Sequence, residues 1–340
     1  MDGTAVPATG AQGRRGGRGW TLLRVAVSAA LIAWILRGTD LREVWATFRT
    51  ADVRYILVAI GLIPLGYLSS VMRWRLLLRA QGGDATLPFL FRSLMTGIFF
   101  NNFLPSTIGG DAIRAWDTAR SGVSRATALT IIMVDRFVGL LALLLFAAVG
   151  LLGAGRLTER VPDLAFWVLG VGALMVIAAA VLFLPRLGGE KVRRAGGNSK
   201  LAKVTEALFA FRGHGKALAG AFFWSLCLQI AVVINAWVIA RALRMDLDLA
   251  PFFLITPLAV FIMMIPVSIN GIGVRENFFI FFLAALGVAE GAGLAFAWLD
   301  YSLLLLQALA GGLVYALGRE RRLPAEMRSA PGAPAEGVVP

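Results

Sequence analysis

Long apolar runs, several of them close to 20 residues, constrain the fold of this chain more than any other feature. A helix of about 20 residues crosses the roughly 30 Å hydrocarbon core of a bilayer. Hydrophobic residues make up 58% of the 340 residues and charged residues 16%, which is more apolar surface than a soluble domain of this length needs. Because the runs lack the alternation of strands, helices are the spanning element that satisfies their backbone groups. The sequence therefore predicts an all-α fold, a polytopic membrane helix bundle.

We divide the chain into three parts. Residues 1–19, rich in Gly, Ala and Arg, and residues 319–340, rich in Pro and Ala, are predicted to be disordered cytoplasmic tails. Residues 20–318 form the integral-membrane domain. One re-entrant helix is predicted over residues 87–108, where Asn101, Asn102 and Pro105 interrupt the apolar run. About eight spans are predicted, at residues 20–36, 53–72, 126–152, 164–184, 217–239, 250–265, 276–290 and 294–317.

Basic residues indicate the orientation of the bundle. Arg73, Arg75 and Arg79 follow the second predicted span, and the loop at 185–216 is strongly basic. An excess of Lys and Arg marks cytoplasmic loops. We therefore expect a multi-pass protein of the plasma membrane with both termini in the cytoplasm. The net charge of +13 is assigned to topology and anionic lipid rather than to nucleic acid.

Two ten-residue stretches have the character of an internal repeat. Residues 105–114 and 266–275 align without a gap at a shift of 161 residues, with four of ten positions identical. Each stretch follows an apolar run, contains Pro and Gly, and ends in Arg. Interrupted apolar segments at matching places in two halves are typical of a transport site. We therefore predict a weak two-fold repeat whose two loops meet near one cavity.

The repeat raises a question of topology. If residues 250–265 were re-entrant rather than a span, the halves would be inverted repeats. Counting spans then places the C-terminus outside, against its arginines at 319, 321 and 322. Eight spans avoid that conflict and are the prediction adopted.

Charged residues inside apolar spans indicate where a site lies, because a central charge in a membrane helix costs several kcal/mol. Asp135 and Arg136 lie in the third span and Asp300 in the last. We expect them to face protein or water, with Arg136 paired to Asp111 or Asp300. Pairing that only holds the bundle together is the structural alternative.

The two glycine-containing loops suit an anion. Glycines let backbone N–H groups approach a ligand, and a helix N-terminus and a planar guanidinium both favour phosphate. Two such loops could hold one phosphodiester headgroup. The predicted substrate-binding residues are Asn101, Asn102, Gly109, Gly110, Asp111, Arg114, Asp135, Arg136, Gly271, Gly273, Arg275, Glu276 and Asp300. A single cysteine excludes an internal disulfide, and a single histidine excludes a multi-His zinc site. That histidine, His214, lies in the basic loop, so no His-based triad is predicted, and no cofactor or metal is predicted.

Several short motifs together resemble one family. They are Arg73-Trp74-Arg75, the stretch 101–105 with Gly109-Gly110-Asp111 and Arg114, the pair Asp135-Arg136, and Ile265-Pro266 with Gly271, Gly273, Arg275 and Glu276. The pattern is similar to the lysylphosphatidylglycerol synthase transmembrane family, also called flippase-like. The resemblance covers roughly residues 20–318. It implies a bundle of about eight helices that, in full-length members, moves aminoacylated phosphatidylglycerol between leaflets.

The chain departs from the full-length members, because residues 319–340 are too short for their soluble synthase domain. The expected function is therefore a lipid flippase or a transporter of lipid-linked substrates, and not an enzyme. An integral-membrane enzyme acting on a lipid headgroup and a non-transporting assembly partner stay open as alternatives. Expected partners are anionic membrane lipids and, as an open alternative, a separate lipid-modifying or glycosyltransferase enzyme.

Overall fold

The computed structural model describes residues 41–103, 108–153, 155–160, 213–264 and 271–319, with a few single positions between these ranges. The predicted span at 20–36 lies almost entirely outside the described residues, and most of the predicted span at 164–184 lies outside them. The same is true of both predicted tails and most of the basic loop at 185–216.

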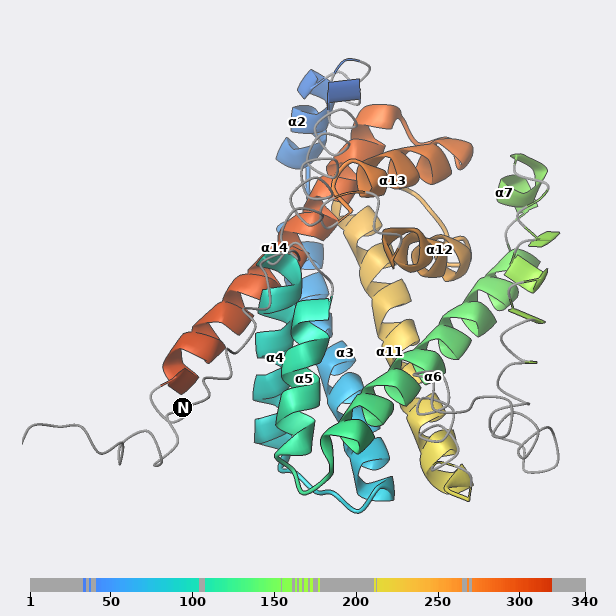
Figure 1. The fold of residues 1–340 in the computed structure, drawn as a ribbon. Helices are drawn as coiled ribbons and strands as arrows, with labels where there is room; N and C mark the ends of the chain where they lie inside the picture. The colour runs from blue at the N-terminus through green and yellow to red at the C-terminus, as the bar shows by residue number, and fades with distance from the viewer. Residues whose placement is uncertain are drawn as a thin grey trace, which may run out of the picture.

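The described part of the chain is all-α and contains no strand, which confirms the predicted fold class (Figure 1). Its helices are α2 (Leu41–Arg49), α3 (Val53–Ala80), α4 (Leu87–Phe103), α5 (Ile108–Ala119), α6 (Arg125–Leu152), α7 (Gly155–Arg160), α11 (Gly215–Ala242), α12 (Phe252–Met264), α13 (Val274–Ala285) and α14 (Glu290–Arg319).

Four of these helices, α3, α6, α11 and α14, are long and apolar enough to cross a membrane. They match the predicted second, third, fifth and last spans. Side chains cap two of them: Asp52 accepts from the N–H of Arg54 before α3, and Ser124 accepts from the N–H of Thr127 before α6. Helix α3 runs eight residues beyond the predicted Met72, so Arg73 lies inside the bundle rather than at its edge.

Helices α3 and α11 form an antiparallel pair. The N–H of Asp52, at the start of α3, donates to the carbonyl of Ala242 at the end of α11, at 2.8 Å. Further along, Asn235 donates to the carbonyl of Ala59 at 2.7 Å, and Arg73 reaches Ser225. We name the two ends of the bundle the Asp52 end and the Arg79 end.

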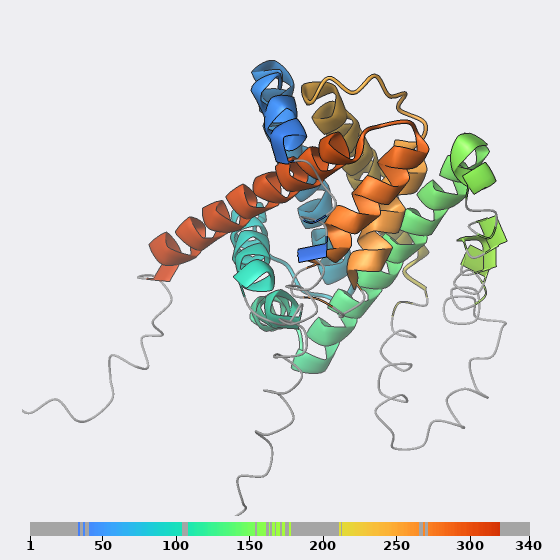
Figure 2. The same ribbon diagram turned by 90° about the horizontal axis from the view of Figure 1, so that it is seen from above.

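Two hairpins of short helices enter the bundle from opposite ends. The first, α4 and α5, has its base at the Arg79 end, where Arg79 holds Asp84 and the N–H of Asp84 bonds the carbonyl of Ser121. Its arms lie side by side in Figures 1 and 2. This is the predicted re-entrant segment, with its return arm now visible as α5.

The second hairpin consists of α12 and α13 and has its base at the Asp52 end. Helix α12 has 13 residues and α13 has 12. At about 1.5 Å per residue each is too short to cross about 30 Å of hydrocarbon. The segments 250–265 and 276–290, predicted as two spans, are therefore the two arms of a broken re-entrant hairpin.

Each hairpin packs on the long helix of the other half, and a glycine allows each close approach. Gly150 of α6 faces the backbone of Leu254 in α12, and Gly311 of α14 faces the carbonyl of Met95 in α4. The segments α3–α6 and α11–α14 are thus inverted repeats that exchange their hairpins.

The inverted arrangement also removes the topological conflict. Neither arm of the second hairpin counts as a membrane span, so the predicted number of spans falls by two and stays even. An even number keeps the two termini on the same side of the membrane. Helix α14 begins beside α2, where Gly291 contacts Glu43, and runs away from the Asp52 end, as α3 does (Figure 1). The C-terminal end of α14 therefore points the same way as Ala80 and its neighbouring arginines.

Candidate functional site

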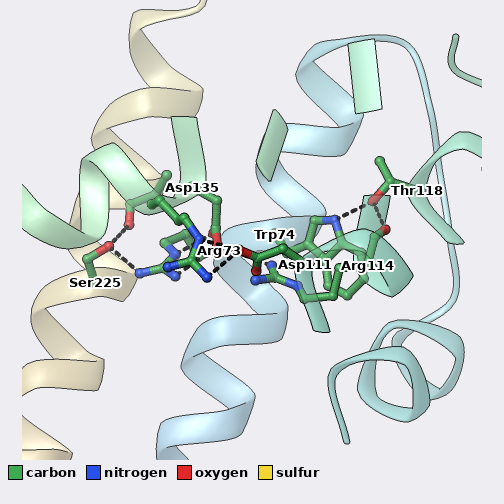
Figure 3. Close-up of polar contacts among 9 residues, drawn as sticks. Arg73, Trp74, Asp111, Arg114, Thr118, Asp135 and Ser225 are labelled. Atoms are coloured by element: carbon green, nitrogen blue, oxygen red, sulfur yellow. Dashed lines mark hydrogen bonds and ion pairs between the residues drawn. The ribbon is translucent and has the colours of Figure 1, made fainter. Parts of the chain in front are cut away.

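The centre of the first half is a buried cluster of one acid and two arginines from three helices (Figure 3). Arg73 of α3 donates two hydrogen bonds to Asp135 of α6, from Nε to Oδ1 at 2.6 Å and from Nη2 to Oδ2 at 3.1 Å. Arg114 of α5 donates from Nη2 to the same Oδ2 at 3.1 Å. The Asp135 side chain is 1% exposed. One carboxylate therefore ties the re-entrant arm α5 to two spanning helices.

The cluster carries more positive than negative charge. Arg73 uses its remaining Nη1 on the hydroxyl of Ser225 in α11, at 3.0 Å. The Nε atom of Arg114 is buried and has no hydrogen-bond partner among the described residues. A buried donor without a partner costs about 1–3 kcal/mol unless a ligand or water satisfies it. The unpaired donor and the excess charge both favour an anion beside Arg114.

Trp74 and Thr118 hold Arg114 in place (Figure 3). The Arg114 guanidinium lies 4.5 Å from the centre of the Trp74 ring. Trp74 donates to the hydroxyl of Thr118 at 3.1 Å, and that hydroxyl donates to the carbonyl of Arg114 at 2.6 Å. Stacking of a guanidinium on an indole is favourable and orients its planar donors.

A second ion pair lies beside the cluster, where the hairpin breaks. Arg136 bonds Asp111, as predicted, and these side chains are 44% and 23% exposed. Asn101 of α4 accepts from the N–H of Gly110 at 2.8 Å. A Cβ at Gly110 would lie 2.3 Å from the carbonyl oxygen of Gly97, so glycine is required where α4 and α5 cross.

These groups surround a cavity of about 360 Å³, which we call the Arg114 cavity. It lies between the first hairpin, α6, α11 and the end of α12. Three arginines and two aspartates are among its described lining residues, which therefore carry one net positive charge. Its charged and polar lining residues are Arg73, Asn101, Asp111, Arg114, Asp135, Arg136 and Gln229.

The second half contains the counterpart of the Arg114–Asp135 pair. Arg275 of α13 lies 3.6 Å from Asp300 of α14 and 4.9 Å from the centre of the Tyr301 ring. Both belong to a separate cavity of about 270 Å³, the Arg275 cavity. The acid follows its arginine by 21 residues in the first half and by 25 in the second, a difference of about one helical turn, and the structure pairs each acid with its arginine.

The glycines of the second loop shape the backbone before α13. Gly271 and Gly273 have φ values of 77° and 84°, a region that favours glycine. Glu276 is buried and accepts from the N–H of Gly273 at 2.6 Å, which caps α13. Asn277 donates to the carbonyl of Gly273. These groups fix the position of Arg275 and line neither cavity.

Arg114 and Arg275 line two separate cavities rather than one. Whether the two loops approach each other stays a prediction, because most of residues 104–107 and 265–270 lie outside the described residues. The Arg114 and Arg275 cavities adjoin and share three apolar lining residues, Leu228, Val232 and Val260. Asn102 turns away to the carbonyl of Ile98. The side-chain surroundings of Gly109 lie outside the described residues. The role of the thirteen predicted residues in binding substrate stays a prediction.

Sequence reasoning missed Arg73 as a site residue. Its position next to Arg75 and Arg79 suggested a cytoplasmic flank, whereas the bidentate pair with Asp135 places it at the centre of the cluster. The resemblance to the motif Arg73-Trp74-Arg75 was the available signal. Ser225, Gln229 and Thr118 were also missed, because single polar residues in apolar runs carry little information without a structure.

Among the described residues, no group of three His, Cys, Asp or Glu side chains is placed to hold a metal ion. The charged and polar groups that line the Arg114 cavity are guanidinium, carboxylate and amide groups.

Comparison with known proteins places the chain in a family. Residues 21–311 match the family described as the lysylphosphatidylglycerol synthase TM region. The chain is 25% identical over 301 residues to a UPF0104 membrane protein of Methanothermobacter thermautotrophicus, covering 81% of this chain and 87% of that protein. It is 20% identical over 329 residues to the UPF0104 membrane protein PH1989 of Pyrococcus horikoshii, covering 88% and 97%. The chain therefore belongs to the lysylphosphatidylglycerol synthase transmembrane family.

Proposed function

We propose that this protein is a flippase or lipid-linked substrate transporter, which moves an anionic phospholipid or polyprenyl-phosphate-type headgroup between leaflets. The observation that carries the proposal is the Arg114 cavity, where buried guanidinium groups exceed their acids by one charge. Such a cationic site at membrane depth is costly and has a physical reason when it receives an anion. Non-helical backbone beside it is tolerated where it lines a cavity.

The inverted repeats support transport rather than simple binding. In transporters of this architecture, broken helices from two halves flank the substrate site, and one half rocks against the other. Here the two hairpins enter from opposite ends and cross into the opposite half. Two adjoining cavities, one beside each hairpin, suit a headgroup that passes from one end of the bundle to the other.

The proposal includes an orientation. The Arg79 end of the bundle faces the cytoplasm. The basic loop at 185–216 leads into the start of α11 at this end, and α14 ends here at the first of the C-terminal arginines. An enzymatic function would need a positioned acid or base. The acids lining the Arg114 cavity, Asp111 and Asp135, are each already held by an arginine. This favours binding and movement of an unchanged lipid over chemistry on it.

A sidedness assay tests the proposal. The protein is reconstituted into vesicles that contain a trace of fluorescent anionic phospholipid, and an impermeant quencher reports the outer-leaflet fraction over time. Exchange between leaflets that exceeds protein-free vesicles is expected, with lipid chemistry unchanged by mass spectrometry. A converted headgroup would indicate an enzyme instead. Neither exchange nor conversion, with a set of anionic lipids tested, would leave the non-transporting assembly role.

A further inference from the structure

The Arg275 cavity contains buried polar atoms that the fold leaves without partners. The Nε and Nη1 atoms of Arg275 and the hydroxyl of Thr256 have no hydrogen-bond partner among the described residues. The Arg275 side chain is 9% exposed, and both residues line the cavity. Buried polar groups in native proteins are almost always satisfied. The cavity is therefore built for a polar occupant that accepts hydrogen bonds from Arg275.

The charge of this cavity differs from that of its neighbour. Arg275 and Asp300 are its only charged lining residues in the described chain, so they cancel, whereas the Arg114 cavity has a net positive charge. Buried Glu276 adds negative charge next to Arg275 in the sequence. A second phosphate would meet less net attraction here and would face Asp300. An uncharged occupant fits this electrostatic setting better.

The remaining polar groups offer both donors and acceptors. Asn235 uses its amide nitrogen on the carbonyl of Ala59, which leaves its oxygen as an acceptor. Gln307 accepts from the Tyr67 hydroxyl through its oxygen, which leaves its amide nitrogen as a donor. Asp300 lies 3.6 Å from Arg275, outside hydrogen-bond range, and its side chain is 33% exposed. Hydroxyl groups, which donate and accept at once, match such a mixed set.

We infer that the Arg275 cavity is a second binding site, for an uncharged hydroxylated group of the polyol or sugar type. A cavity of about 270 Å³ accommodates a six-membered ring. The hydroxylated group is either the part of the headgroup that lies beyond the phosphate or a free polyol. The first of these readings rests on the proposed function, because it requires an anionic headgroup in the Arg114 cavity.

Matched soluble probes test the inference by calorimetry on the purified, full-length protein. Inositol 1-phosphate and cyclohexyl phosphate share a six-membered carbon ring and a phosphate and differ in the five ring hydroxyls. We expect inositol 1-phosphate to bind with a Kd at least tenfold lower, since each buried hydrogen bond contributes a factor of a few. Free myo-inositol is the third probe. Its saturable binding indicates a free polyol, and its failure to bind while inositol 1-phosphate binds indicates a headgroup.

Two variants locate the effect. Thr256→Val removes one hydroxyl at constant shape and should raise the Kd of the hydroxylated probe several-fold, leaving cyclohexyl phosphate unchanged. Thr130→Val is the matched control, because Thr130 is also buried in a membrane helix but bonds the carbonyl of Ala126 and lines neither cavity. It should change neither Kd.

Two outcomes would overturn the inference. Equal affinity of wild-type protein for the two phosphates, with no binding of myo-inositol, would mean that the cavity holds only water. The second outcome uses Thr256→Val and Gln307→Leu, which each remove a polar group from the lining of the Arg275 cavity. If both variants still bind inositol 1-phosphate as much more tightly than cyclohexyl phosphate as the wild type does, the hydroxyl site lies elsewhere. Neither outcome depends on leaflet exchange. Conversely, a vesicle assay without exchange would refute transport while leaving selective binding of the probes intact.

Discussion

Arg73 and Asp135 form a two-point ion pair inside the helix bundle, with the same bonding pattern that Arg79 and Asp84 make at its surface. The buried pair has distances of 2.6 and 3.1 Å, and the exposed pair has 3.0 and 3.2 Å. The Asp84 side chain is 60% exposed, against 1% for Asp135. The same bonding pattern therefore occurs in two dielectric settings, and the buried Asp135 also accepts a hydrogen bond from Arg114.

We expect Asp135→Asn to destabilise the bundle by about 3–5 kcal/mol, because it leaves Arg73 and Arg114 buried without a counter-charge. Asp84→Asn removes the same group from the surface pair and should change stability little. Denaturant unfolding of both variants in one detergent measures the difference. If the two variants lose equal stability, burial of Asp135 does not govern its role. The double variant Arg73→Met/Asp135→Leu should recover part of the loss.

Arg114→Lys should abolish leaflet exchange while the protein still inserts and folds. Lysine keeps the charge but lacks the planar fork that matches a phosphate and stacks on Trp74. Insertion depends on apolar length and flanking charge, which this substitution does not alter. The measurement is exchange of fluorescent anionic lipid, normalised to folded protein.

Arg92→Lys is the control for that substitution. Arg92 lies on α4 of the same hairpin and lines neither cavity. It should exchange lipid at the wild-type rate. Wild-type exchange by Arg114→Lys would remove the phosphate role of the guanidinium and leave Arg114 as a structural partner of Asp135.

The sequence predicted the helical class, four observed spans and an acidic partner for Arg136, which is Asp111 of the two candidates, Asp111 and Asp300. These predictions depend on local information. The length of an apolar run indicates whether a helix can cross the membrane, and a charged side chain within such a helix is usually paired because burying it alone is costly. The second hairpin was predicted as two spans because α12 is apolar throughout and the C-terminal arginines favoured that count, although the predicted end of the first of them, at residue 265, lies next to the observed end at Met264. The separation into two cavities depends on how α11 and α12 pack, which no local pattern encodes.

Arg73 illustrates the same limit within the site. A cluster of arginines after an apolar run is the usual mark of a cytoplasmic end, and Arg79 fits it. The extension of α3 to Ala80 instead carries Arg73 about two turns into the bundle. Partners on α6 and α11, 62 and 152 residues away in the sequence, then decide its role.

Gly311→Ala should destabilise the protein by about 1–3 kcal/mol through overpacking. A Cβ at this position would lie 2.2 Å from the carbonyl oxygen of Met95, so α4 and α14 would have to separate. Gly61→Ala adds the same methyl group on α3, where nothing lies within 4 Å, and should be neutral or stabilising. Thermal unfolding in detergent compares the pair. Equal midpoints would mean that the crossing of α4 on α14 is not tightly packed.

Val232→Ala should speed leaflet exchange, because Val232 belongs to the apolar wall between the two cavities. The wall consists of Leu228, Val232 and Val260, each of which lines both cavities. A headgroup that passes between them must displace these side chains, and a barrier lowered by about 1 kcal/mol raises a rate about fivefold. Val232→Phe should slow exchange by narrowing the same passage.

Val233→Ala is the matched control, since Val233 is the next residue on α11 but is fully buried in the core and lines neither cavity. It should lower stability without raising the rate. If Val232→Ala and Val233→Ala exchange lipid equally, the wall is not on the path of the headgroup.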